Sequence, residues 1–263
     1  MATYFTKRDF IRSSLILAGT AWSGSLFGQS AKPRFNVLVM TEAGGIHAPF
    51  VAAAKTWLAD QAATTSFAIH YIENAEPIND KFLAQYQLFI QLNYPPYMWS
   101  DTAKAAFQKY ITEGKGGWIG FHHATLLGEF DGYAMWPWFS DFMGGIRYKN
   151  YIPDFAKATV RVEAKSHPCL KGVPASFEIQ KEEWYTYDKS PRPNVNVLAS
   201  VDESTYSPDS PIKMGDHPVV WSNEQVKARN VYIFMGHHPN LLDNKAFTTL
   251  FRNAILWGAG QKN

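Results

Sequence analysis

The stretch GGWIGFHHATLLG, from Gly116 to Gly128, places an apolar run directly ahead of two adjacent histidines. The run Trp118–Phe121 has the continuous apolar character of a strand that is buried on both faces. Successive strand residues point to opposite faces, so His122 and His123 can serve one site only if the strand ends in a turn there. Such a strand-to-helix turn lifts a side chain into a cleft. The stretch therefore predicts a parallel α/β sheet with a functional site where its strands end.

The rest of the chain alternates strands and helices, as an α/β domain requires. Apolar, β-rich runs occupy Phe35–Met40, Phe67–Ile72, Leu88–Leu92 and Gly117–His122. Helical patterns lie between them over residues 49–63 and 100–114, and an amphipathic helix that ends at Gly258 closes the chain. After Lys149 we expect further strands at Ala158–Ala164, Val195–Val201, Val219–Ser222 and Val231–Met235. Because no repeat or linker divides this part, we expect one α/β domain over residues 32–263.

The first 31 residues differ in kind from the rest. A basic flank at Lys7–Arg8 and Arg12 precedes a weakly apolar stretch and the small residues Ser30 and Ala31. This order is typical of an export signal, and Lys7–Arg8 followed by Phe10–Ile11 is similar to a twin-arginine signal with lysine in the first place. We therefore predict an export signal over residues 1–31 and a periplasmic location.

Charge and cysteine content restrict the expected partners. The net charge of +2 belongs to the predicted signal, because the remainder carries equal numbers of acidic and basic residues. This balance does not favour binding to nucleic acid or to a membrane surface, and no apolar run is long enough to span a bilayer. The single Cys169 cannot form an intramolecular disulfide. A small molecule is the expected partner.

Histidines gather where the predicted strands end. His47 follows the first strand, His122 and His123 follow the fourth, and the pair His237 and His238 follows the last. Imidazole is a proton shuttle near neutral pH and a common metal ligand. We predict catalytic roles for the first four, and His47, His122 and His237 are also candidates to hold Zn²⁺ or a similar divalent ion. Since His-x-x-x-His and Cys-x-x-Cys spacings are missing, such a site would need ligands from distant loops.

The segment EIQKEEWYTYD, residues 178–188, is the source of carboxylates. On an extended strand Glu183 and Tyr185 share one face, with Glu182 and Trp184 on the other. Glu183 is the catalytic candidate, and the alternative is a solvated edge strand. Aromatic residues crowd the loops, where they either roof the core or present flat faces to a sugar ring. On the second interpretation the residues assigned to substrate are Trp99, Trp136, Trp138, Tyr148 and Tyr185, together with His238.

These motifs together resemble the ThuA-like (trehalose-utilisation) family. The resemblance rests on GGWIGFHHAT, WPWFSDFMGG, SHPCLKGVPASFEIQKEEWYTYD, HPVVWSNE and VYIFMGHHP, which occur in the family's order over essentially the whole chain after residue 34. It implies a class I glutamine amidotransferase-like fold, a flavodoxin-like three-layer sandwich with a mainly parallel sheet. His47 matches the family's Gly-Gly-x-His loop, His122 its Gly-x-His strand end, Glu183 its Glu-Trp-Tyr element and His237 its Gly-His near the C-terminus.

The chain departs from the family pattern in two places. His123 stands where many members carry serine, and NEQVKARNVY replaces a Gly-Lys-Gly-Arg turn, which puts the role of that loop in doubt. The chain also differs from the glutaminases of this fold, which attack with a cysteine thiolate at the strand-end turn. Here that turn holds histidines and Cys169 lies in another loop, so thioester chemistry on glutamine is not expected.

The resemblance further implies carbohydrate chemistry, because ThuA-like members are associated with disaccharides and with oxidoreductases that make 3-keto sugars. A ketone acidifies the neighbouring C2–H, so a base could remove that proton while an acid assists departure of the C1 substituent. The base would be His122 or His123, the acid Glu183 or His237, and His47 an electrophilic partner or ligand, with a divalent metal as a variant. Two alternatives stay open: a sugar-binding module without turnover, and a metal-dependent hydrolase of another polar substrate.

Overall fold

The computed structural model describes residues 32–261, so the predicted export signal lies outside the described residues. The strands are β1 (Phe35–Thr41), β2 (Phe67–Ile72), β3 (Leu88–Leu92), β4 (Gly117–Phe121), β5 (Tyr148–Tyr151), β6 (Ala156–Val162), β7 (Ser176–Glu182), β8 (Tyr185–Tyr187), β9 (Asn196–Ser207), β10 (Pro218–Ser222) and β11 (Asn230–Ile233). The α-helices are α1 (Ala48–Thr65), α2 (Asp80–Leu83), α3 (Asp101–Thr112), α4 (Pro137–Phe142) and α5 (Lys245–Gly258). Short 3₁₀ helices are η1 (His122–Thr125), η2 (Pro168–Leu170), η3 (Arg192–Asn194) and η4 (Pro239–Asp243).

Within residues 32–261, nine strands form one sheet in the order β2-β1-β3-β4-β11-β10-β9-β6-β7. The five strands from β2 to β11 are parallel to one another. From β11 onward each neighbouring pair is antiparallel, and β5 pairs with β8 in a separate two-stranded ribbon. The predicted α/β fold with a large parallel sheet is confirmed, and the change in sequence texture after Lys149 precedes the antiparallel half.

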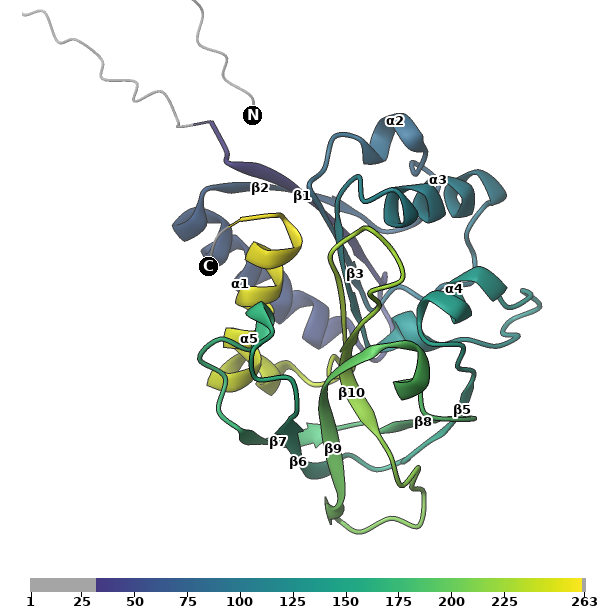
Figure 1. The fold of residues 1–263 in the computed structure, drawn as a ribbon, viewed down its shortest axis with the longest axis vertical. Helices are drawn as coiled ribbons and strands as arrows, with labels where there is room; N and C mark the ends of the chain where they lie inside the picture. The colour runs from purple at the N-terminus through teal and green to yellow at the C-terminus, as the bar shows by residue number, and fades with distance from the viewer. Residues whose placement is uncertain (1–31, 262–263) are drawn as a thin grey trace, which may run out of the picture. The chain divides into compact units, whose positions relative to one another are not determined.

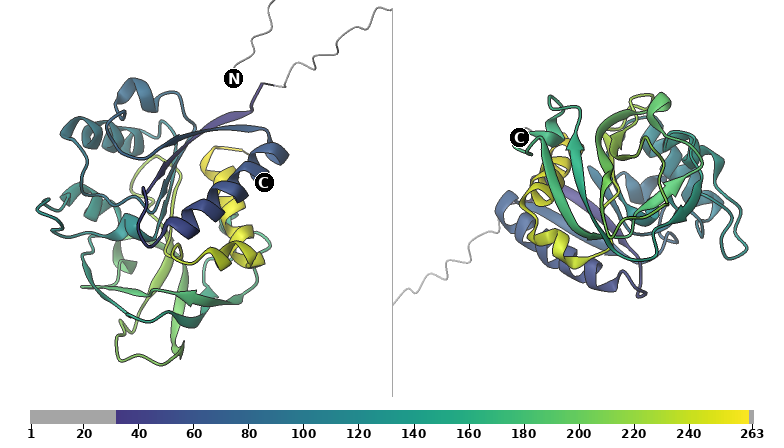
Figure 2. Two further views of the ribbon diagram at one scale, coloured as in Figure 1. Left: turned by 180° about the vertical axis from the view of Figure 1, so that it is seen from behind. Right: turned by 90° about the horizontal axis from the view of Figure 1, so that it is seen from below.

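Helices cover both faces of the parallel half, which gives three layers. Helices α1 and α5 lie together on one side of the sheet, while α2, α3 and α4 lie on the other (Figures 1 and 2). Trp57 of α1 stacks on Phe251 of α5 with ring centroids 4.6 Å apart. On the opposite face Phe107 of α3 packs against Trp118 of β4. None of the helices in this described part is both long and apolar enough to cross a membrane.

The parallel strands bring distant loops to one edge of the sheet. Register pairs Gly120 of β4 with Gln91 of β3 and with Tyr232 of β11, so the neighbouring strands end at nearly the same level. The loops that follow β1, β4 and β11 therefore emerge side by side. Two of these strands end earlier than the sequence predicts, at Phe121 and Ile233, which moves their histidines out of the sheet.

Candidate functional site

The backbone turns sharply where β4 ends. Phe121 is extended, whereas His122 has a φ of 38° in the left-handed region that residues other than glycine rarely adopt. The hydroxyls of Thr125 and Tyr232 donate to the carbonyl oxygen of His122 at 3.0 and 2.9 Å, and these bonds hold the unusual conformation. The strand therefore ends where the adjacent histidines require it to end.

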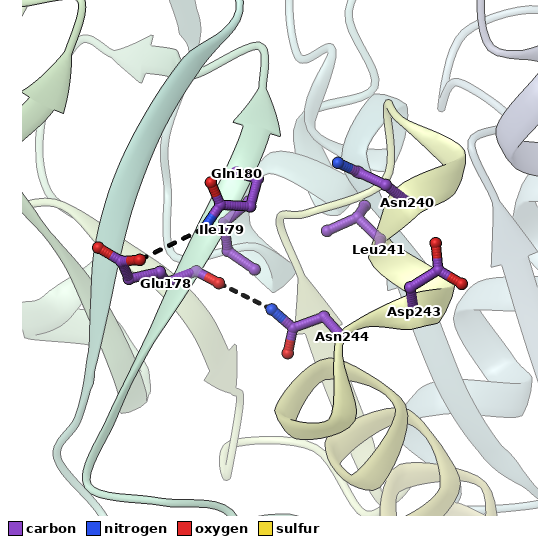
Figure 3. Close-up of a pocket in the computed structure, with 7 residues that line it drawn as sticks. All are labelled: Glu178, Ile179, Gln180, Asn240, Leu241, Asp243 and Asn244. Atoms are coloured by element: carbon purple, nitrogen blue, oxygen red, sulfur yellow. Dashed lines mark hydrogen bonds between the residues drawn. The ribbon is translucent and has the colours of Figure 1, made fainter.

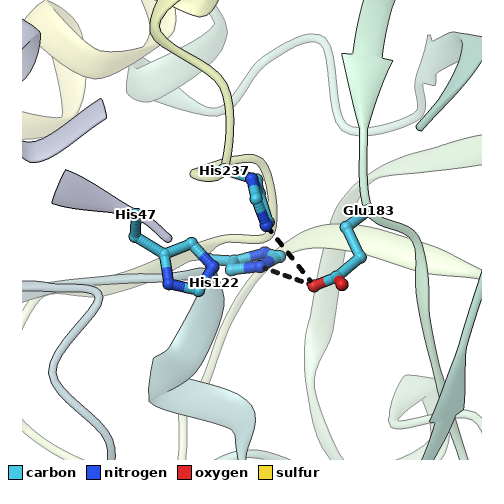
Figure 4. A group of neighbouring side chains, drawn as sticks. All are labelled: His47, His122, Glu183 and His237. Atoms are coloured by element: carbon cyan, nitrogen blue, oxygen red, sulfur yellow. Dashed lines mark ion pairs between the residues drawn. The ribbon is translucent and has the colours of Figure 1, made fainter. Parts of the chain in front are cut away.

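Four side chains from distant segments meet beside this turn (Figure 4). His47 precedes α1, His122 begins η1, Glu183 lies between β7 and β8, and His237 follows β11. One potential ligand atom from each residue lies within 4.8 Å of those of the other three. Glu183 Oε2 is 3.5 Å from His122 Nε2 and 3.8 Å from His237 Nε2. The structure thus brings together four of the five residues for which the sequence predicts catalysis.

Several ring nitrogens of this cluster are buried without a hydrogen bond. His122 is 0% exposed and His47 is 1% exposed. Within the described part of the chain, Nε2 of His47 and Nε2 of His122 have no hydrogen-bond partner, whereas Nδ1 of His47 faces the Glu42 carboxylate at 3.0 Å. An unpaired buried polar group costs roughly 1–3 kcal/mol, so such groups indicate a bound species. Three imidazoles and a carboxylate suit a divalent transition metal such as Zn²⁺.

The protonation of His122 fits a metal ligand or a base. Its Nδ1 lies 3.2 Å from the carbonyl oxygen of Phe234, which can only accept, so Nδ1 carries the proton and the lone pair of Nε2 faces Glu183. Burial, with the neighbouring His123, His47 and His237, holds the pKa of His122 well below its usual range. Burial likewise lowers the pKa of His237 to about 4. Neutral imidazole is the form that ligates a metal.

Glu42 lies behind two of the histidines, and its role could not be read from the sequence pattern. Its Oε2 lies 3.0 Å from His47 Nδ1 and 3.3 Å from His123 Nδ1. Burial alone would raise the pKa of Glu42, but the contacts with His123 and His47 outweigh it and lower the pKa to about 2. A carboxylate behind a histidine ligand orients the ring and makes it more basic. The sequence feature that could have indicated Glu42 is its place in TEAGGIH, directly after the first strand. His123 lies outside the four-residue cluster, with its ring 4.0 Å from that of His47.

Glu182 is the other carboxylate that the sequence analysis left out of the site. It is 0% exposed, its Oε2 accepts the N–H of Gly236 at 3.0 Å, and its Oε1 accepts the N–H of Glu183 at 3.1 Å. Oε1 also lies 3.8 Å from His122 Nδ1. Burial raises the pKa of Glu182 to about 8, against the opposing effect of the backbone N–H groups. Glu182 therefore joins three segments that carry the clustered side chains. As the solvated-edge alternative expects, β7 is the edge strand of the sheet and its Glu178, Gln180 and Lys181 are exposed, but Glu182 at its end is buried.

The aromatic residues assigned to substrate fall into two groups. Tyr185 covers His122 with ring centroids 4.4 Å apart and lowers the pKa of the neighbouring Glu183, against the larger opposing effect of burial, and Tyr148 packs against Tyr185 at 5.2 Å. Both therefore lie at the cluster.

The tryptophans instead pack in the core. Trp99 and Trp136 are buried, and both contact Phe107 of α3, so neither offers a free face to a sugar ring. Trp138 is half-buried and stacks on Phe142. These three residues follow the alternative in which the aromatic loops roof the core. His238 caps η4 by accepting the N–H of Asn240 and does not belong to the cluster.

A hollow of about 230 Å³ lies between β7 and η4 (Figure 3). Its polar groups bond one another: Asn244 Nδ2 donates to the carbonyl oxygen of Glu178 at 2.7 Å, and Gln180 Nε2 donates to the Glu178 carboxylate at 3.3 Å. It has none of the unpaired buried nitrogens found at the histidine cluster. The chemistry is therefore better placed at the imidazoles.

Comparison with known proteins shows the family and the fold of the chain. The model of the family described as ThuA, trehalose utilisation, matches residues 36–258. The chain belongs to the ThuA family. A putative ThuA-like protein from Bacteroides uniformis is 30% identical, with a TM-score of 0.76 over 89% of this chain and 95% of that chain. One from Parabacteroides merdae is 18% identical, with a TM-score of 0.58 over 88% and 91% of the two chains. A comparison with curated proteins gave no match.

The ThuA chain also shares its fold with glutaminases. The glutaminase domain of Trypanosoma brucei CTPS with bound acivicin is 9% identical, with a TM-score of 0.52 over 87% of this chain and 95% of that chain. Such low identity shows the fold alone. In the ThuA chain Cys169 is buried in η2, and burial raises the pKa of its thiol. It therefore lacks the accessible thiolate that glutamine hydrolysis requires.

Proposed function

We propose that this ThuA-family chain is a metal-dependent enzyme that acts on an oxidised (3-keto) glycoside or disaccharide. The observation that carries the proposal is the buried cluster of His47, His122, His237 and Glu183, whose ligand atoms lie within 4.8 Å of one another. A sugar-binding module would need stacking surfaces and hydrogen bonds, but not three buried imidazoles, two of them with an unpaired Nε2. The family description, trehalose utilisation, supports a carbohydrate substrate. The export signal and periplasmic location are proposals that rest on the sequence of residues 1–31.

The metal would be held by Nε2 of His122 and of His237, by a ring nitrogen of His47, and by Oε2 of Glu183. When bound, a divalent ion supplies a Lewis acid that polarises a ketone oxygen of the substrate. The neighbouring groups of the chain favour this arrangement, because Phe234 fixes the tautomer of His122 and Glu42 lies behind His47.

Proton transfer would fall to His123, which lies next to the cluster and faces Glu42. In this scheme neutral His123 takes the proton from C2 of the 3-keto sugar, the electron pair forms the C1–C2 double bond, and the bond from C1 to the leaving oxygen breaks. His123 then returns the proton to that oxygen, so the products are an unsaturated keto sugar and the free alcohol. Since Glu183 and His237 are proposed ligands, the acid role passes from them to His123. A positioned transfer of this kind contributes about 10²–10⁴-fold.

The test compares 3-keto and ordinary glycosides as substrates, with and without a chelator. We expect release of the alcohol from the keto compound only, loss of release on chelation, and recovery on adding Zn²⁺. His122→Ala should reduce kcat at least about 100-fold, and elemental analysis should show loss of its metal. His167→Ala is the control, because that histidine caps η2 and contacts Trp257. Full activity of the chelated protein and of His122→Ala would refute the metal-dependent mechanism.

A further inference from the structure

We call the cluster of His47, His122, Glu183 and His237 the polar centre, and exposed apolar side chains lie in loops at the same edge of the sheet or contact it. Among residues 32–261 the large apolar side chains that stay exposed are Ile46, Met98, Tyr133, Tyr151 and Phe155, at 40–69%. We call these five the apolar rim. Ile46, Met98 and Tyr133 lie in loops that follow β1, β3 and β4, at the same edge of the sheet as the histidines. Exposed apolar groups that gather in one place mark a binding surface.

Two rim residues contact the centre directly or through one ring. The ring of Phe155 lies 4.7 Å from that of His237. Tyr151 contacts Tyr185 at 6.5 Å, and Tyr185 in turn covers His122. A substituent that leaves the centre on this side would therefore meet Phe155 or Tyr151 within one ring contact.

The loop after η1 presents Tyr133 from another side. Asp131 and Gly132 have φ values of 52° and 81°, and the Tyr133 N–H donates to the Phe130 carbonyl oxygen at 2.8 Å, as in a tight hairpin turn. The ring of Tyr97 holds this turn in place, because Phe130 stacks on it with ring centroids 5.3 Å apart and Tyr133 contacts the same ring at 6.1 Å.

We propose that the apolar rim is the subsite for the leaving group, and that it accepts a flat apolar aglycone such as a phenyl ring in preference to a second sugar. The inference rests on the proposed function. In this proposal the hydroxyls of a sugar at the polar centre lie close to imidazoles and carboxylates, and its C1 substituent is directed toward Phe155 and Tyr151 of the rim. Ile46, Met98 and Phe155 have no strong hydrogen-bonding group to satisfy the hydroxyls of a second pyranose. They can remove an aryl surface from water.

The experiment measures binding by calorimetry, with phenyl 3-keto-glucoside, methyl 3-keto-glucoside and 3-keto-trehalose as probes on the full chain. We expect the phenyl compound to bind at least about fivefold more tightly than the other two, since each partly covered side chain contributes about three- to tenfold. The double variant Tyr151→Ser/Phe155→Ser should weaken binding of the phenyl compound about tenfold or more, and binding of the methyl compound less than about twofold. Lys149→Ser, an exposed change on the same strand, should alter neither.

The outcomes separate the inference from the proposed function. Equal affinities of the three probes, or a phenyl preference that the double variant keeps, would overturn the inference while leaving the function intact. A chain that binds the phenyl compound at the rim but turns over none of the probes would support the inference and refute the proposed reaction. Binding of none of the probes would overturn both. A dimer that the double variant dissociates would assign the rim to a second copy, and would also overturn the inference.

Discussion

Replacing Glu182 with glutamine tests whether one buried carboxylate holds the centre together. Both oxygens of Glu182 accept backbone N–H groups, one from Gly236 and the other from Glu183. A glutamine side chain has a single acceptor oxygen, and its amide nitrogen would face another N–H. At least one backbone N–H would therefore lose its partner inside a fully buried site.

The size of the effect follows from that count. An unpaired buried N–H costs about 1–3 kcal/mol, and the opposed N–H groups add to this, so we expect Glu182→Gln to lose about 2–4 kcal/mol of unfolding free energy. For a chain of this length each kcal/mol shifts Tm by roughly 2–4 °C, so the expected fall in Tm is about 4–16 °C. Because Glu182 joins the segments of Glu183, His237 and His122, affinity for Zn²⁺ should also fall, by about 10–100-fold.

Thermal unfolding by circular dichroism and a Zn²⁺ titration against a competing chelator measure the two effects. Glu178→Gln is the matched control, the same change on the same strand, where the exposed carboxylate pairs only with Lys157 and Gln180 at the surface. It should cost less than about 1 kcal/mol. A difference in Tm of about 2 °C is close to the precision of the measurement. If the Tm of Glu182→Gln lies within about 2 °C of that of the control, and the variant binds Zn²⁺ as tightly as the parent chain, the bridging role of Glu182 is wrong.

Three further changes have expected outcomes. Gly236→Ala would place a Cβ 2.8 Å from the Cβ of His122 and 2.9 Å from Asn93 Oδ1, so we expect a loss of about 1–3 kcal/mol in urea unfolding with weaker Zn²⁺ binding; unchanged stability would show that the loop moves freely. Zn²⁺ at about 100 times its Kd should stabilise the parent chain against unfolding by about 2.7 kcal/mol. It should stabilise the His122→Ala variant far less. If Zn²⁺ raises the Tm of both proteins equally, the ion binds elsewhere. Burial opposes ionisation of Glu203, but His217 and the N–H groups of the 214–215 turn lower its pKa overall. Its stabilising contribution is therefore present above the unfolded-state pKa of about 4.3 and lost as pH falls through the lower folded value. Urea titrations from pH 7 to 3 should show a flatter acid decline in Glu203→Gln than in the parent chain, and parallel curves would contradict this.

The fold and the clustering of His47, His122 and His237 could be predicted because both depend on local pattern. Continuous apolar strands indicate a parallel sheet, and the carboxyl ends of parallel strands meet, so histidines placed after them gather without knowledge of their distances. The carboxylates of Glu42 and Glu182 could not be predicted this way, although Glu183 was. Glu182 is buried only because β7 ends where the β11 loop packs against it, and that contact joins the two halves of the sheet.

The aromatic residues show a second limit. A single sequence does not tell whether an aromatic side chain in a proline-rich loop points inward or outward. Trp99 and Trp136 pack against Phe107 and belong to the core, whereas Tyr133 and Phe155 remain exposed. The difference is set by how α3 and the hairpin after η1 pack, which the local pattern does not encode.

The position of β11 has a consequence for how the protein is made. This strand comes near the end of the chain, yet it lies in the middle of the sheet between β4 and β10. A nascent chain that has not yet delivered β11 from the ribosome holds two half-sheets with open edges, and it also lacks His237. The two halves can therefore join only after β11 has been synthesised, and the same step brings His237 to the other clustered histidines.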